Sequence, residues 1–271
     1  MLHILKTEWL KIKRYRAFWW VMGITALTYP GINYMALAIY KEAMTQKSKE
    51  LVKMLFGNPF SFPETWHTAA YFSSLFIFIP AIVIIMLITN EYTYKTNRQN
   101  IIDGWSRKDF MVAKLIDVVL LSALVTLLYS VVALAIGLSN TSDANAATTW
   151  QQVHYIGLFA LQAFSQLSLA FLAGFLLRKS FIALAVFAFY FIIAEPVAVK
   201  ILKYKYHNEI GEFFPREISD RLLPAPAFFS KFNEAAYKTS LNDIHYHIYY
   251  TLVLIIITWG FCFWLNNRRD L

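Results

Sequence analysis

The sequence has little charge and almost no cysteine. Asp, Glu, Lys and Arg make up 15% of its 271 residues, and Cys262 is the only cysteine. Soluble domains carry about 25% charged residues, so a soluble enzyme is excluded. A single cysteine also excludes an intrachain disulfide framework.

Motifs for catalysis and for phosphate binding are absent as well. No G-x-x-x-x-G-K-[ST], G-x-S-x-G or H-E-x-x-H pattern occurs, and the nine glycines are scattered singly. His245 and His247 form the only close histidine pair, and side chains two residues apart on a helix point to different sides. We therefore predict no catalytic residue, no metal site and no cofactor in this chain.

Hydrophobic residues make up 58% of the chain and are concentrated in six apolar stretches. A helix of about 20 apolar residues can cross a bilayer. The sequence therefore predicts an all-α integral membrane protein, with residues 1–271 forming one transmembrane domain of six helices. The predicted spans are 17–40, 69–89, 115–138, 153–177, 181–199 and 247–266.

Basic residues indicate how these spans are oriented. The segments that would lie inside, among them 1–16 and 90–114, carry 14 of the 25 Lys and Arg residues. Seven of the others lie in the long segment 200–246 or directly before it, and long loops weigh little in topology. We therefore predict a multi-pass protein of the cell inner (plasma) membrane with both termini cytoplasmic. The net charge of +8 is then a positive-inside signal and does not indicate nucleic-acid binding.

The first residues have the pattern of an amphipathic helix. Leu2, Leu5, Trp9 and Ile12 share one face of a helix over 2–14, and the lysines lie off that face. Such a helix lies in the membrane interface, where its lysines meet anionic lipid. The alternative is that these charges only set the topology.

The inner loop 90–114 is longer than a simple connection needs. Thr96 with Gln99 and Ser106 with Asp109 fit two capping boxes, and Gly104 suits a left-handed helix end. We expect a short helix over 97–103, then a turn, then the start of the next span. Such a cytoplasmic element is typical of a docking site.

The outer segment 200–246 is too apolar for a solvated loop and predicts re-entrant or interfacial helices.

Two acidic residues fall inside predicted spans. Glu195 lies deep in the fifth span, and a carboxylate in lipid is by default a candidate functional residue. It is a candidate for the translocation path, or it has a structural role by pairing with Lys200 or facing water. Asp117 is three residues from Lys114 and is expected to form an ion pair with it.

Together these features resemble the permease subunits of ABC-2 type transporters, a group that includes bacitracin- and lantibiotic-export permeases. The resemblance covers the whole chain and is sharpest after the second span, where Lys95 stands at a position that is usually glycine. The residues that carry it are Glu91, Thr96, Arg98, Gln99, Asn100, Asp103, Gly104, Ser106, Arg107, Phe110 and Lys114.

The resemblance implies a fold and a set of partners. The fold would be the ABCG-like, type V exporter membrane domain, with 1–16 as its connecting helix and 97–103 as its coupling helix. Two nucleotide-binding ATPase subunits would carry the ATP and Mg²⁺, and a second permease copy or a paralogous permease would complete the membrane part. Membrane lipid surrounds the chain. Coupling to the ATPase would involve Glu91, Thr96, Arg98, Gln99, Ile101, Ile102, Asp103, Gly104, Ser106 and Arg107.

The resemblance favours export of an amphiphilic substrate, such as a peptide antibiotic, a lipid or a drug. A stand-alone secondary transporter or channel is the first alternative, but it would need paired half-repeats or several charges within the membrane. An integral membrane enzyme acting on lipid is the second, and it would need a polar constellation at one membrane face.

Overall fold

A computed structural model describes residues 2–45, 57–141, 146–226 and 234–268. These residues form helices and connections without a strand, as the sequence predicted. The helices are α1 (Leu2–Arg14), α2 (Arg16–Thr45), α4 (Thr65–Ser74), α5 (Phe78–Thr93), α6 (Thr96–Ile102), α7 (Arg107–Asn140), α8 (Ala146–Thr149), α9 (His154–Leu177), α10 (Ser180–Phe189), the π-helix η1 (Tyr190–Ala194), α11 (Glu195–Lys205), the 3₁₀ helix η2 (Glu209–Phe213), α12 (Pro215–Asp220) and α14 (Glu234–Arg268).

Four helical stretches in the described residues are long and apolar enough to cross a membrane. They are α7, α9, the stretch from Ser180 to Lys205, and Tyr237–Arg268 within α14. The pair α4 and α5 is bent by 48° at a short break and makes a fifth if it counts as one span. The predicted first span corresponds to α2, which falls outside this set because its Trp, Tyr and Asn residues lower its mean hydropathy. The six predicted spans are therefore supported only in part.

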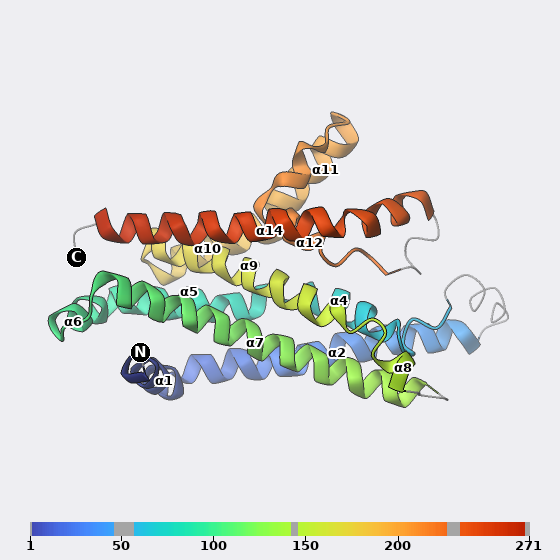
Figure 1. Ribbon diagram of the computed structural model, residues 1–271, viewed down its shortest axis with the longest axis horizontal. Helices are drawn as coiled ribbons and strands as arrows, with labels where there is room; N and C mark the ends of the chain where they lie inside the picture. The colour runs from blue at the N-terminus through green and yellow to red at the C-terminus, as the bar shows by residue number, and fades with distance from the viewer. Residues whose placement is uncertain (1, 46–56, 142–145, 227–233, 269–271) are drawn as a thin grey trace.

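The long helices form a bundle with α9 at its centre, as Figure 1 shows. Helix α9 packs against α4, α5, α7, α10, α12 and α14. Small residues allow these close approaches: a Cβ atom added at Gly174 would lie 2.5 Å from Ile88 Cγ2 and 3.3 Å from the backbone of Ile85. Large aromatic side chains of α9, among them Phe159, Phe171 and Phe175, fill the core around it.

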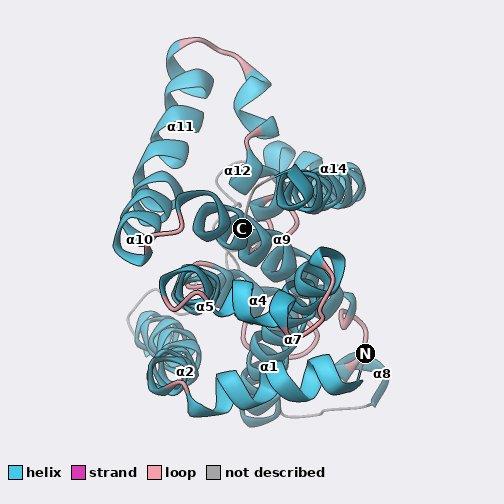
Figure 2. Cartoon of the chain, turned by 90° about the vertical axis from the view of Figure 1, so that its left-hand side faces the viewer, coloured by secondary structure: helices cyan, strands magenta, loops and turns pink. Residues whose placement is uncertain are grey.

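Helix α6 lies at one end of this bundle, which we call the α6 end. The N-terminal helix α1, the turn between α9 and α10, and the last turn of α14 lie at the same end (Figures 1 and 2). Figure 2 shows α1 lying across the bundle, not along it. This is the arrangement expected of an interfacial helix.

The stretch from α10 to α11 leans away from the bundle (Figures 1 and 2). The chain then turns back through η2, and α12 packs against α9 and α14. Leu222 and Leu223, just after α12, are buried. The predicted segment 200–246 thus contains short helices, although its residues 227–233 lie outside the described part. The last helix begins at Glu234, earlier than the predicted start at 247.

Candidate functional site

Helix α6 and its flanking turns form a hairpin between α5 and α7. The predicted capping box at Ser106 is confirmed, because its hydroxyl accepts a hydrogen bond from the Asp109 amide at 3.0 Å and the Asp109 carboxylate accepts one from the Ser106 amide. Gly104 has a φ of 97°, as the turn requires. Helix α6 ends at Ile102, close to the predicted boundary.

The predicted capping box at Thr96 is wrong. Thr96 is the first residue of α6, and its hydroxyl donates a hydrogen bond to the Glu91 carboxylate. Gln99 donates to Asp103 at 3.0 Å and does not reach back. Lys95 takes the N-cap position with a φ of 56°. This left-handed conformation favours glycine, the residue that the resemblance led us to expect at this position.

Residues from three helices form a buried ion cluster beside α6. Lys114 of α7 lies 2.9 Å from the Glu91 carboxylate of α5 and also contacts the carboxylate of Glu8 in α1. Lys11 bridges the same two glutamates at 2.9 Å each. Lys114 also pairs with Asp117 at 3.3 Å, as the sequence predicted. Apart from Lys11, whose side chain is 29% exposed, these side chains are almost fully buried.

The two lysines keep the carboxyls of Glu8 and Glu91 ionised. Burial alone raises the pKa of Glu8, but the ammonium groups of Lys114 and Lys11 outweigh burial, so the pKa of this carboxyl lies below its usual value. Because Thr96 donates to Glu91, the start of α6 is tied directly to the cluster. The cluster therefore joins α1, α5, α6 and α7 into one unit.

The hairpin is also bound to the far end of the chain. The Arg107 guanidinium donates hydrogen bonds to the carbonyls of Asn266 and Asn267, at 3.1 Å and 3.0 Å. The Asn266 side chain donates back to the Arg107 carbonyl at 3.0 Å. These bonds fix the first turn of α7 to the last turns of α14.

The outward face of α6 has one apolar side chain. Ile102 is 78% exposed, and Arg98, Gln99 and Asp103 around it are also exposed. Ile101 is only partly exposed and faces a cavity together with Phe110. Of the two isoleucines that the resemblance assigns to ATPase coupling, Ile101 and Ile102, only Ile102 is therefore exposed to a partner.

Glu195 anchors the segment that returns to the bundle. One of its carboxylate oxygens accepts hydrogen bonds from the backbone amides of Arg216 and Glu217, at 2.7 Å and 2.8 Å. These are free amides of the first turn of α12, and Glu195 itself is 2% exposed. This position agrees with a structural role, but Glu195 is buried and does not face water, and its partner is the start of α12 and not Lys200. A role in the translocation path stays a prediction.

A second polar group near Glu195 was not identified from the sequence. Asp220 accepts hydrogen bonds from Gln162 at 2.9 Å and Gln166 at 2.7 Å, and it pairs with Arg216 at 2.9 Å. Burial raises the pKa of Asp220 to about 6, although Arg216 and the two glutamines favour its charged form. The two glutamines, one turn apart in an apolar span, were the available signal.

One protein family matches most of the chain. The family described as "ABC-2 family transporter protein" matches residues 4–194, from α1 to the end of η1. The chain belongs to the ABC-2 transporter family. No curated protein matches the chain.

Membership indicates the role of the chain. An ABC-2 permease is the membrane component of an ABC transporter and is not itself catalytic. The family implies an ABC ATPase as partner. The α6 hairpin and the ion cluster lie within the matched ABC-2 region.

Proposed function

We propose that this ABC-2 permease forms the translocation path of an ATP-driven exporter and that α6 docks into a cleft of the ATPase. Two ATPase subunits would bind ATP and Mg²⁺, and a second permease, identical or paralogous, would complete the path. The cargo would be an amphiphilic molecule such as a peptide antibiotic, a lipid or a drug. The observation that carries this proposal is the exposed, charge-rimmed Ile102 at the tip of a helix that is fixed to the base of the bundle.

The exposed surface of α6 suits a shallow protein cleft. Burial of the Ile102 side chain would contribute about 1.5–3 kcal/mol, and Arg98 and Asp103 would supply a polar rim. An exposed side chain of this size on a short helix, surrounded by charge, is typical of an interface anchor.

The internal contacts of the hairpin suit force transmission. Helix α6 is joined to α5 and α7 at its two ends, to α1 through the cluster around Lys114, and to α14 through Arg107. A rigid movement of α6 in an ATPase cleft would therefore move the ends of several spans together.

The same placement supports an orientation in the membrane. The α6 end carries the basic segments that the positive-inside rule assigns to the cytoplasm. With six spans, counting α2 and the bent pair α4–α5 as one each, both termini are cytoplasmic and α6 faces the ATPase. Helix α1 would lie in the inner interface of the plasma membrane.

The experiment is a substitution at the tip of α6. Ile102→Asp places a carboxylate at the position where an apolar side chain would enter the cleft. We expect the variant to insert normally into the membrane. The amount of ATPase that co-purifies with it should fall at least tenfold, because the burial of Ile102, about 1.5–3 kcal/mol, is lost. Ile102→Leu keeps the apolar surface and should retain the ATPase.

A charge control separates docking from general electrostatics. Lys13 is exposed on α1, and Lys13→Asp should leave the ATPase bound. If Ile102→Asp retains the ATPase as well as Ile102→Leu does, α6 is not the docking helix. If no ATPase accompanies the wild-type chain, the proposed complex is wrong.

A further inference from the structure

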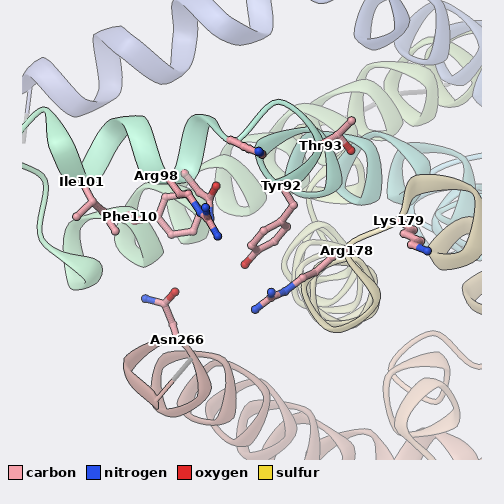
Figure 3. A pocket seen from close by; sticks show the side chains of 10 residues that line it. Tyr92, Thr93, Arg98, Ile101, Phe110, Arg178, Lys179 and Asn266 are labelled. Carbon is pink, nitrogen blue, oxygen red and sulfur yellow. The ribbon is translucent and has the colours of Figure 1, made fainter. Parts of the chain in front are cut away.

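A cavity of about 360 Å³ opens at the α6 end, between parts of the chain that are far apart in sequence. Its lining comes from the end of α5, from α6, from the turn between α9 and α10, and from the last turns of α14. In Figure 3, Arg98 and Arg178 extend toward the space between α5–α6 and α14, and Asn266 points up from α14. Lys179 lies at the edge of the same view.

All the charged residues of the lining are positive. It contains Lys95, Arg98, Arg178 and Lys179, and it contains no acidic residue. Within the described ranges, none of these four side chains forms an ion pair, whereas Lys11 and Lys114 in the nearby cluster are fully paired. Four cations around one concave surface create a strong positive potential.

The backbone adds an independent observation. Lys95 and Arg178 have φ values of 56° and 57°, and His207 is the only other non-glycine residue with a positive φ in the described part of the chain. Glycine is favoured in this conformation. Both cavity positions nevertheless carry a long cationic side chain, which points to a use for the charge.

An aromatic ring holds one of these cations in place. The Arg178 guanidinium lies over the ring of Tyr92, 4.9 Å from its centroid. This contact is a cation–π interaction with the face of the ring, and the N–H groups of a guanidinium lie in its own plane, directed along its edges. Edge N–H groups in this arrangement bind the two oxygens of a phosphate or a carboxylate.

Exposed apolar side chains flank the cations. Leu177 precedes Arg178, and Phe181 and Ile182 follow Lys179 at the start of α10. Phe181 is 84% exposed and Ile182 is 44% exposed. Positive charge at the end of two apolar helices, next to an apolar surface, matches an anionic headgroup with acyl chains attached.

We propose that this cavity binds the phosphate group of an anionic phospholipid, with the headgroup between Lys95, Arg98 and Arg178 and the acyl chains along the start of α10. A free phosphate ion shares the headgroup chemistry but lacks the acyl chains. The lipid belongs to the leaflet at the α6 end, and Arg98 lies where this site adjoins the proposed ATPase-docking face of α6.

The test makes use of the left-handed backbone conformation at Lys95 and Arg178. Lys95→Gly with Arg178→Gly removes both charges and places glycine where the backbone favours it, so the fold is preserved. The purified full chain is incubated with equal amounts of phosphatidylglycerol and phosphatidylcholine, and the lipid retained after gel filtration is measured. We expect the wild-type chain to retain phosphatidylglycerol preferentially. The double variant should bind it about 25-fold more weakly, since each of the two cations near an anionic headgroup contributes about fivefold.

Two controls match the two changes in the variant. His207→Gly makes the same backbone change outside the cavity, and Lys13→Gln with Lys108→Gln removes two exposed charges at the α6 end. Both should retain phosphatidylglycerol as the wild-type chain does. A charge control that loses as much lipid as the double variant would overturn the site, because attraction would then be general.

Competition separates the possible sources of the phosphate group. Inorganic phosphate at millimolar concentration should not displace the lipid, because it lacks the apolar contacts. If inorganic phosphate displaces it fully, or if the double variant retains phosphatidylglycerol unchanged, the cavity is not a phospholipid site. If the double variant keeps the lipid and loses only the ATPase, the cations serve a protein partner and the proposal is wrong.

Discussion

The molecule holds carboxylates inside the bundle in two regions and stabilises them in different ways. At the α6 end, Glu8, Glu91 and Asp117 surround Lys114, and Lys11 completes the cluster. Around α12, backbone amides hold Glu195, while two glutamines and Arg216 hold Asp220. The first region joins helices by charge, and the second joins them mainly by hydrogen bonds.

This difference indicates how firmly each region is held. A buried ion pair that loses one partner leaves an uncompensated charge, so it cannot open without a large cost. A hydrogen-bonded carboxylate can exchange its partners for water at a lower cost. We therefore expect the α6 end to move as one unit and the α11–α12 segment to open more easily.

The largest effect is expected at Lys114. Lys114→Met leaves Glu8, Glu91 and Asp117 facing one another without their shared cation, which should lower the free energy of unfolding by about 3–5 kcal/mol. Thermal unfolding of the purified protein measures the change. Lys11→Met is the matched control, and it should lower the stability by about 1 kcal/mol or less, because Lys11 is partly exposed and Lys114 remains. Equal losses in the two variants would contradict the central role of Lys114.

A smaller effect is expected at Glu195. Glu195→Ala leaves two amides of α12 without an acceptor and should cost about 1–3 kcal/mol, whereas Glu195→Gln keeps an acceptor oxygen and should cost less. Limited proteolysis within residues 206–220 and thermal unfolding report the loss of the anchor. A stable Glu195→Gln variant that assembles with its ATPase but no longer transports would instead support the translocation role predicted from the sequence.

The smallest effect is a pH dependence at Asp220. Its pKa is raised from 3.8 to about 6 by burial, so between these pH values the folded state holds a proton that the unfolded state has lost. Its contribution to stability is therefore present below about pH 4 and is lost as pH rises through 6. Asp220→Asn cannot titrate, so the stability of the wild-type protein relative to this variant should fall by about 1 kcal/mol between pH 4 and pH 7, because partial exposure weakens the effect. A constant difference across this range would show that Asp220 does not titrate there.

Sequence reasoning succeeded where the interaction is local. The capping box of Ser106 with Asp109 and the pair of Lys114 with Asp117 join residues three apart, and spacing alone predicts them. Thr96 with Gln99 has the same spacing and fails, because the Glu91 carboxylate takes the Thr96 hydroxyl and Lys95 takes the cap position. A local pattern was overridden there by a contact with the preceding helix.

Contacts between distant residues left no readable pattern. Glu8 meets Lys114 across 106 positions, and nothing in either segment indicates the other. One interpretation of Glu195 paired it with Lys200, but Pro215 starts a helix whose free amides are a better partner for a buried carboxylate. The apolar stretches indicated a bundle of helices, whereas only the folded chain shows which of them lean away from it.

The placement of α14 has a consequence for dividing the chain into fragments. Family similarity stops at residue 194, yet Trp259 of α14 stacks on Phe171 of α9 with ring centroids 4.8 Å apart and donates a hydrogen bond to Ser168 at 3.0 Å. Asn266 likewise closes the first turn of α7. A fragment that ended at the limit of the similarity would leave one side of the central helix uncovered. The matched region is therefore shorter than the packed bundle, and α14 covers the side of α9 that this region alone would leave exposed.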